Sequence, residues 1–192
     1  GAGAFAMTIK QIKKFNPDCK VEVLIPDFNG NKSSLETVIK ASPDVLNHNI
    51  ETCRRVFRVV RPKGDYDQSI ELLRRVKELN PKIPTKSGMM VGLGETEDEI
   101  IETMNDLRKV NCDLLTIGQY LRPSKKHHEI DKFYHPKEFT KFEKEGISDG
   151  SIAPSNSVEN WVSNQINNAP EDDAWSLDDI KRLKQMVADG TD

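Results

Sequence analysis

Apolar residues recur at helical spacing in four separate stretches of this chain. The first stretch carries Phe5, Ile9 and Ile12 on one side and is stopped by Asn16-Pro17, a pair that disfavours helix. Ser34 is a plausible N-cap for the second stretch, and Thr96 with Glu99 forms a capping-box pattern before the fourth. The pattern therefore predicts helices over residues 4–15, 34–41, 67–79 and 96–110.

Short β-branched or apolar runs separate these helices. Each run spans five to seven residues, and several end in proline, glycine or polar residues, as strands commonly do. The runs cover residues 21–25, 44–49, 85–91 and 113–119. Because strands and helices alternate along the chain, the pattern predicts βαβ units and an α/β fold built on a parallel sheet.

The last quarter of the chain has a different composition. Residues 1–145 carry 25 Lys and Arg against 22 Asp and Glu, whereas residues 146–192 carry 3 against 9. The second part is rich in Ser, Asn and Asp, and Ser-Asp-Gly at 148–150 is typical of a break. We predict one domain over residues 1–145, followed by a flexible acidic tail over 146–192 with one helix near 176–189.

Composition narrows the class of protein. The net charge of −3 gives no support for general nucleic-acid binding, and no apolar run is long enough for a membrane span or a signal peptide. We therefore expect no nucleic acid or membrane partner and see no targeting segment. The three cysteines, Cys19, Cys53 and Cys112, form no recognisable frame for zinc or an iron–sulfur cluster, so we predict no metal ligands. A sparse, odd number of cysteines fits a reducing compartment.

Polar or glycine-rich residues follow all four predicted strands. In parallel α/β folds, ligands gather at the carboxyl ends of the strands, so these segments are expected to share one ligand rim. The alternative is ordinary loop chemistry. The segments are Pro26–Gly30, Asn47–Glu51, Gly92–Glu95 and Gln119–Pro123.

Five stretches of the sequence resemble lipoyl synthase, in the family's order: VEVLIPDF (21–28), PDVLNHNIET (43–52), VRP with GDY (60–66), TKSGMMVGLGET (85–96) and LTIGQYLRPS (115–124). This resemblance covers about residues 1–142 and implies the fold of the radical S-adenosylmethionine (SAM) superfamily. The fold would be a partial, TIM-barrel-like (βα) barrel without its N-terminal strands. In the family, SAM and two 4Fe-4S clusters serve a sulfurtransferase reaction of lipoate biosynthesis. Two sulfur atoms enter a protein-bound octanoyl chain, which completes protein lipoylation.

The resemblance also implies which residues bind the cofactor. Gly88, Met90, Gly92 and Glu95 are similar to the G-x-I-x-G-x-x-E strand motif, with Met90 in the isoleucine place beside an adenine ring. Asn47, Asn49 and Glu51 would share one face if their strand persists, where a carboxylate can accept hydrogen bonds from a ribose. The remaining expected cofactor-binding residues are Lys86, Ser87, Tyr120 and Leu121. The alternative for the glycine motif is a plain strand-to-helix turn, and the alternative for Asn47, Asn49 and Glu51 is a solvated loop. For Lys86 and Ser87 the alternative is an exposed strand start.

The chain also departs from the family pattern. The C-x-x-x-C-x-x-C motif, the auxiliary-cluster cysteines and the final R-S-S-Y stretch are absent, so we expect neither cluster to be held by this chain. We assign no catalytic residue and expect an incomplete enzyme that is inactive alone. Two alternatives stay open: a non-catalytic interaction protein that keeps a carrier-protein surface, and a frameshifted gene fragment.

Partners and location are further expectations from the resemblance. Octanoylated lipoyl-carrier domains are the implied partners, and a bacterial cytoplasmic or a mitochondrial location is implied. Arg54, Arg55, Arg58 and Arg61 are spaced along one expected helix, either as a solvated face or as a contact with an acidic carrier domain. Residues 21–25 would form an unpaired sheet edge, which favours self-association. His48 is interpreted as a hydrogen-bonded histidine rather than a metal ligand.

Overall fold

A five-stranded parallel sheet with the order β1-β2-β3-β4-β5 forms the centre of the computed structural model. The structure describes residues 1–147 and 153–154. The strands are β1 (Glu22–Leu24), β2 (Val45–Asn47), β3 (Thr85–Val91), β4 (Leu114–Gln119) and β5 (Ala153–Pro154). Every neighbouring pair is parallel, which confirms the α/β prediction.

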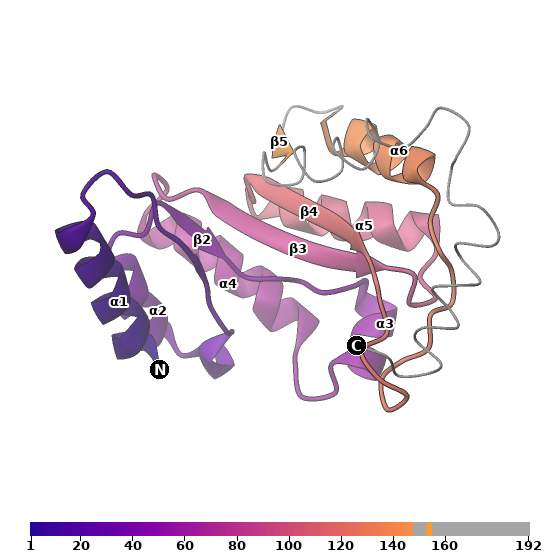
Figure 1. Ribbon diagram of the computed structural model, residues 1–192, viewed down its shortest axis with the longest axis horizontal. Helices are drawn as coiled ribbons and strands as arrows, with labels where there is room; N and C mark the ends of the chain where they lie inside the picture. Colours follow the sequence, from indigo (N-terminus) through magenta and orange to yellow (C-terminus); the bar gives the residue numbers. More distant parts are fainter. Residues whose placement is uncertain (148–152, 155–192) are drawn as a thin grey trace.

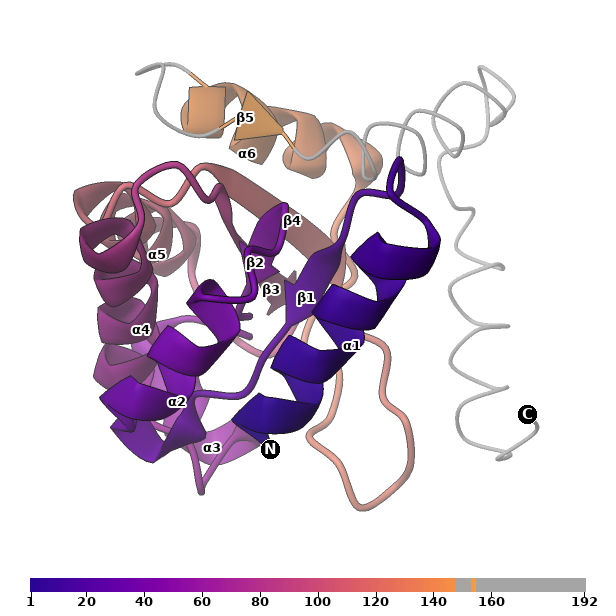
Figure 2. The ribbon, with the colours of Figure 1, turned by 90° about the vertical axis from the view of Figure 1, so that its left-hand side faces the viewer.

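Helices connect the strands and cover one side of the sheet (Figure 1). They are α1 (Ala2–Phe15), α2 (Lys32–Ile39), α3 (Arg54–Val60), α4 (Tyr66–Leu79), α5 (Glu97–Lys109) and α6 (Pro136–Ile147), with a short 3-10 turn at Phe28–Gly30. Figure 2 shows α2, α4 and α5 on the same side of the sheet, with α1 beside β1. Parallel connections require such crossovers, and these helices carry the apolar stripes that the sequence predicted.

The core lies between these helices and one face of the sheet. Its strand residues include Val23, Leu46 and Leu115, and its helix residues include Val38, Leu73 and Leu107, all buried. In β3 the burial alternates residue by residue, so Thr85, Ser87, Met89 and Val91 face the helices. The opposite face of β3 is only half-buried, and this is the face that reaches the predicted ligand rim.

Two boundary predictions need correction. The second helix begins at Lys32 rather than Ser34, because the side chain of Asn31 accepts a hydrogen bond from the Ser34 backbone and caps the helix. The second strand ends at Asn47, two residues earlier than expected. By contrast, Thr96 and Glu99 form both hydrogen bonds of the predicted capping box.

The division of the chain at residue 145 stays a prediction. Helix α6 runs on to Ile147, and β5 pairs with β4 beyond it. The expected tail helix near 176–189 lies outside the described residues. Among the residues that are described, no helix is long and apolar enough to cross a membrane.

Candidate ligand site at the carboxyl ends of the strands

Four of the predicted ligand residues lie on the face of the sheet opposite the helices, which we call the open face. Asn47 pairs in register with Lys86, and Gly88 and Met90 follow on the same side of β3 because side chains alternate. Thr116 and Gly118 of β4 pair with Gly88 and Met90 and extend this face. The hydroxyl of Ser87, by contrast, is buried on the helix side and accepts a hydrogen bond from the Ile50 backbone at 3.1 Å.

An ion pair joins β1 to β3 across this open face. The Lys86 ammonium lies 3.1 and 3.2 Å from the two carboxylate oxygens of Glu22, so its charge is balanced within the chain. Asn47 donates to the same Glu22 carboxylate at 3.1 Å, while its own side-chain oxygen is buried without a partner among the described residues. Glu22 was not among the residues predicted from the sequence. A charged residue within the apolar strand run 21–25 was the signal that could have identified it.

Gly88 and Asn49 make a close approach. A Cβ atom at Gly88 would lie 2.8 Å from the side-chain oxygen of Asn49, a distance that real Cβ contacts avoid. A side chain at Gly88 would push the half-buried Asn49 amide away from the strand, so glycine allows this close contact. These two predicted residues are in contact, although Asn49 itself lies beyond the end of β2.

Glu51 occupies a strained position at the rim. Its φ angle is 69°, a left-handed value that is uncommon for residues other than glycine. The premise that a continuous strand aligns Asn47, Asn49 and Glu51 is therefore wrong, since Glu51 forms only an isolated bridge with Met89. Its backbone bonds with Gly88 and Met90 hold this conformation in place. Strain that is held in this way is common at functional sites.

The carboxylate of Glu51 pairs with Arg61. The Arg61 guanidinium donates to Oε1 at 2.8 Å, from just after the end of α3. Desolvation by burial raises the pKa of Glu51, and the charge and hydrogen bond of Arg61 partly oppose that rise. The sequence placed Arg61 in a basic cluster, but its contact with Glu51 was not foreseen.

Gly92 and Glu95 build the loop after β3. The buried Glu95 carboxylate accepts hydrogen bonds from the backbone of Gly92 and Leu93, at 2.5 and 2.8 Å. Gly92 has a φ of 105°, and a Cβ there would lie 2.5 Å from the Gln119 amide nitrogen and the Lys132 carbonyl. In this structure both residues therefore shape the loop, and the Glu95 carboxylate is bound to the backbone.

The two residues predicted after β4 differ in burial. Tyr120 is buried and donates its hydroxyl to the His128 carbonyl at 3.0 Å, whereas Leu121 is 55% exposed. Tyr120 belongs to a small cluster with Cys53, Val56 and Leu93, against which Val60, Met90 and Ile130 pack. We call this group the satellite cluster. It joins α3 and the loop after β4 to the rim.

Histidine and cysteine in the described part of the chain do not form a metal site. His48 is buried and its Nδ1 bonds the Ile25 carbonyl at 2.9 Å, which confirms the hydrogen-bonded interpretation. Burial raises the pKa of Cys53, and that of Cys112 to about 12, so both favour the thiol over the metal-binding thiolate. Among residues 1–147 and 153–154, no group of three or more His, Cys, Asp or Glu could hold a metal ion.

The sequence matches the Radical SAM superfamily over residues 2–107. That match covers more than half of the chain. The chain belongs to the radical SAM superfamily. Within it, the chain is 55% identical over 150 residues to the lipoyl synthase of Caldanaerobacter subterraneus and 53% identical to that of Halalkalibacterium halodurans. The alignments cover 78% of this chain and 52% and 50% of those proteins, so it spans about half the length of the curated relatives it matches.

Solved structures support the fold of this radical SAM chain. Methylornithine synthase has a TM-score of 0.59 at 13% identity, covering 95% of this chain and 62% of that one. The coproporphyrinogen III oxidase of Escherichia coli has a TM-score of 0.56 at 13% identity, covering 84% and 37%. At such low identity these similarities bear on the fold alone. The superfamily match and the lipoyl synthase relatives confirm the resemblance that the sequence motifs indicated.

Proposed function

We propose that this chain forms the part of a lipoyl synthase barrel that holds the adenosyl portion of S-adenosylmethionine. The open face of the sheet carries this proposal. No atom of the described residues lies within 4 Å of a Cβ built on Gly118, and its register partner Met90 is only half-buried. A flat ring can approach the backbone where a side chain is absent, and a thioether packs well against a ring.

Polar groups beside this space suit a nucleoside. Glu51 bonds the backbone of Met90, and its carboxylate, held by Arg61, can accept hydrogen bonds from two hydroxyls, whereas the Asn47 oxygen lies on the same face but is itself buried. When bound with a reduced iron–sulfur cluster, S-adenosylmethionine supplies a deoxyadenosyl radical that abstracts hydrogen. The cysteines described above do not fit a cluster, so we assign no step of that chemistry to them and propose that this chain alone is inactive.

The proposed whole-protein reaction is sulfur insertion into a protein-bound octanoyl chain, in the cytoplasm of a bacterium or in a mitochondrion. Its support is the identity to lipoyl synthases. The role of this chain can be tested with 5′-deoxyadenosine, which needs no cluster to bind. In a titration followed by NMR, we expect saturable shifts at Gly88, Met90 and Gly118 and none with uridine. Unchanged resonances at all three positions would contradict the proposal.

A further inference from the structure

A basic surface that forms no ion pair with residues 1–147 or 153–154 borders the satellite cluster. The sequence grouped Arg54, Arg55, Arg58 and Arg61, but the structure divides them. Arg54 pairs with Asp67 and Asp106, Arg55 with Glu99, and Arg61 with Glu51. Arg58 is exposed and forms no ion pair with any described residue.

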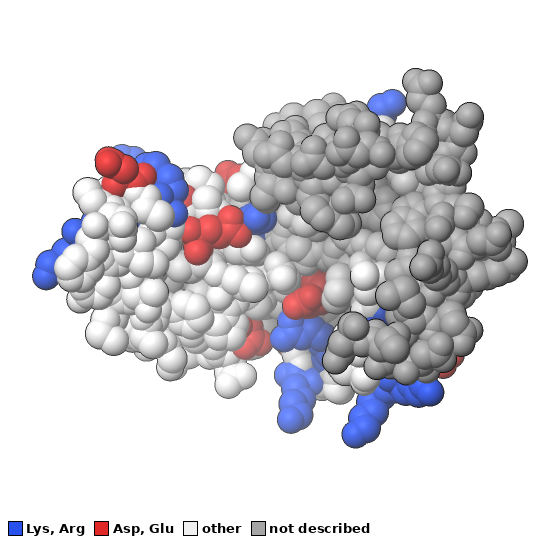
Figure 3. Space-filling model, in the orientation of Figure 1, with Lys and Arg blue, Asp and Glu red and all other residues white. Residues whose placement is uncertain are grey.

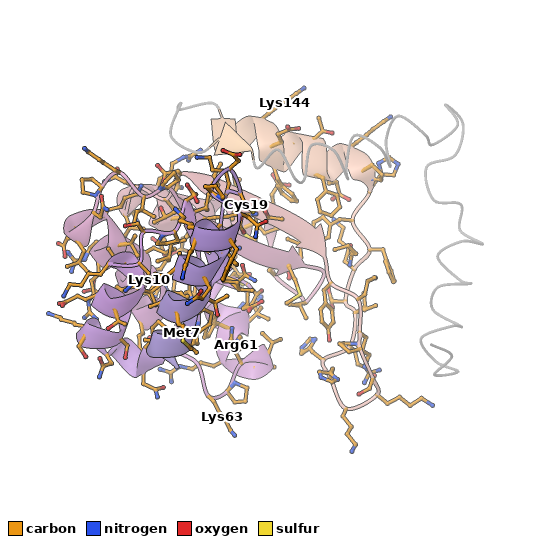
Figure 4. The ribbon with its side chains drawn as sticks, turned by 60° about the vertical axis from the view of Figure 1, so that its left-hand side comes forward. Met7, Lys10, Cys19, Arg61, Lys63 and Lys144 are labelled. Carbon is orange, nitrogen blue, oxygen red and sulfur yellow. The ribbon has the colours of Figure 1, made fainter. Side chains whose placement is uncertain are left out.

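Three lysines extend this surface. Lys63 follows α3 in a turn closed by the backbone bond from Gly64 to Arg61, while Lys125 and Lys126 lie in the loop after β4. All three are exposed and have no ion pair within the described part of the chain. Figure 4 shows Lys63 projecting from the molecule near Arg61, and Figure 3 shows basic side chains projecting along this edge. We name Arg58, Lys63, Lys125 and Lys126 the basic rim.

The two halves of the basic rim are held together by packing. Val56 and Val60 of α3 pack in the satellite cluster with Tyr120 and Ile130, which flank the loop that carries Lys125 and Lys126. Arg122 holds this loop from within, donating to the carbonyls of His127 at 2.9 Å and Lys125 at 2.7 Å. The positive charges therefore sit on a preorganised surface, which reduces the entropy lost on binding.

Two exposed apolar side chains accompany the basic rim. Val59 is 65% exposed and neighbours Arg58, and Leu121 is 55% exposed and follows Tyr120 of the satellite cluster. Apolar residues beside charged groups are typical of protein interfaces, in which charge steers encounter and apolar contact adds affinity. The whole chain has a net charge of −3, so this local excess of positive charge runs against the overall balance.

We propose that the basic rim, with Val59 and Leu121, is the docking surface for an acidic protein domain that presents an acylated lysine to the open face of the sheet. The choice of partner rests on the proposed function, and the choice of surface on charge and exposure. The basic rim lies beside the site because Met90, on the open face, packs against the satellite cluster. A partner docked there brings its modified lysine to the carboxyl ends of the strands.

The test is titration of this chain with an octanoylated lipoyl-carrier domain of acidic surface, followed by fluorescence anisotropy. Arg58→Glu/Lys63→Glu and Lys125→Glu/Lys126→Glu should each weaken binding by about tenfold or more, because like charges repel across an interface. Lys10→Glu/Lys144→Glu is the control. It makes the same charge change on α1 and α6 at exposed lysines without ion pairs to described residues (Figure 4).

Salt dependence and apolar contact give further readouts. Between about 50 and 300 mM salt, wild-type affinity should fall more steeply than that of either rim variant, since screening weakens exposed charge pairs. Val59→Ser should weaken binding without changing the salt dependence. The proposal would be overturned if the rim and control variants bound the carrier domain equally well, or if the wild-type chain did not bind it. It would also be overturned if the rim variants lost as much affinity for a DNA duplex as for the carrier domain. If the NMR shifts caused by 5′-deoxyadenosine persist in the rim variants, the proposed function stands even when the docking proposal fails.

Discussion

Arg61 donates a hydrogen bond to Oε1 of Glu51 across 2.8 Å and so ties the end of α3 to the strained rim residue. Only 10 residues separate the two in sequence, but the contact exists because α3 turns the chain back toward the rim. Burial favours the neutral form of Glu51, and Arg61 favours the charged form. The balance between them determines how well this carboxylate can accept hydrogen bonds from a ligand.

Arg61→Met should raise the pKa of Glu51 further, because the change removes the charge and hydrogen bond that oppose desolvation. A carboxyl-carbon NMR titration of Glu51 would measure this rise in pKa. Arg61→Lys, which keeps the positive charge, should bring the pKa of Glu51 part of the way back toward the wild-type value. Because the folded pKa of Glu51 exceeds its usual 4.5, stability is lost as pH rises through that folded pKa. Removing Arg61 should therefore cost more near pH 7 than near pH 4, by about 1 kcal/mol given its exposed side chain. An unchanged Glu51 titration would contradict this.

Gly92→Ala should destabilise the chain strongly, whereas Gly118→Ala should have little effect on stability. At Gly92 the φ of 105° and a Cβ 2.5 Å from the Lys132 backbone leave no room for a side chain. We expect a loss of about 2–4 kcal/mol in unfolding free energy, from strain and overpacking together. At Gly118 the methyl meets no atom of the described residues, and stability should change by less than about 1 kcal/mol.

The larger change Gly118→Val should weaken 5′-deoxyadenosine binding while preserving the fold, because its side chain fills the proposed ring position. Urea unfolding and the NMR titration give the two readouts. Full retention of nucleoside binding in Gly118→Val would place the ring elsewhere.

Thr96→Ala should destabilise the chain through α5. The Thr96 side chain accepts from the Glu99 backbone, and Glu99 in turn accepts from the Thr96 backbone, so the variant breaks one half of the capping box. The expected cost is about 1 kcal/mol. Thr37→Ala is the matched control, because the exposed Thr37 lies within α2 and contributes no cap. Equal midpoints of thermal unfolding for the two variants would count against this role.

Stability should fall as pH drops below about 6.5, and His48 should account for part of the fall. Burial lowers the pKa of His48 in the folded chain. As the pH decreases, the unfolded chain is therefore protonated at His48 first, which shifts the equilibrium toward unfolding. His48→Gln keeps a donor for the Ile25 carbonyl but cannot titrate. Unfolding measured from pH 7 to 5 should show a shallower slope in this variant; an identical slope would exclude His48 as a source.

We expect the chain to associate with itself through β1, which lies at the end of the strand order. Leu24 on this strand is 54% exposed, and an exposed apolar edge is a pairing hazard. Leu24→Lys should reduce the associated fraction in sedimentation velocity. Leu79→Lys, at a 46% exposed position near the end of α4, should leave it unchanged. A wild-type chain that sediments as a monomer at all concentrations would contradict this expectation.

Local signals in the sequence were sufficient for much of the fold. The strand over residues 85–91 and the capping box at Thr96 and Glu99 both depend on residues close together in the chain, and both are confirmed. The N-cap was misjudged because Asn31 and Ser34 are both good caps, and sequence spacing alone does not choose between them. Helix α6 was not predicted at all.

The sequence by itself therefore determined the order of the first four strands and the helices between them, the parallel sheet and the family motifs, since hydrophobic period and short-range capping act locally. Tertiary structure alone decided which polar groups meet. Glu22 and Lys86 are 64 residues apart and pair because β1, β2 and β3 lie side by side in register. It also placed Ser87 and Lys86 on opposite faces of β3, and it paired Arg54 and Arg55 with carboxylates while Arg58 has none among the described residues. Charge pairing depends on distance in space, which no local pattern specifies.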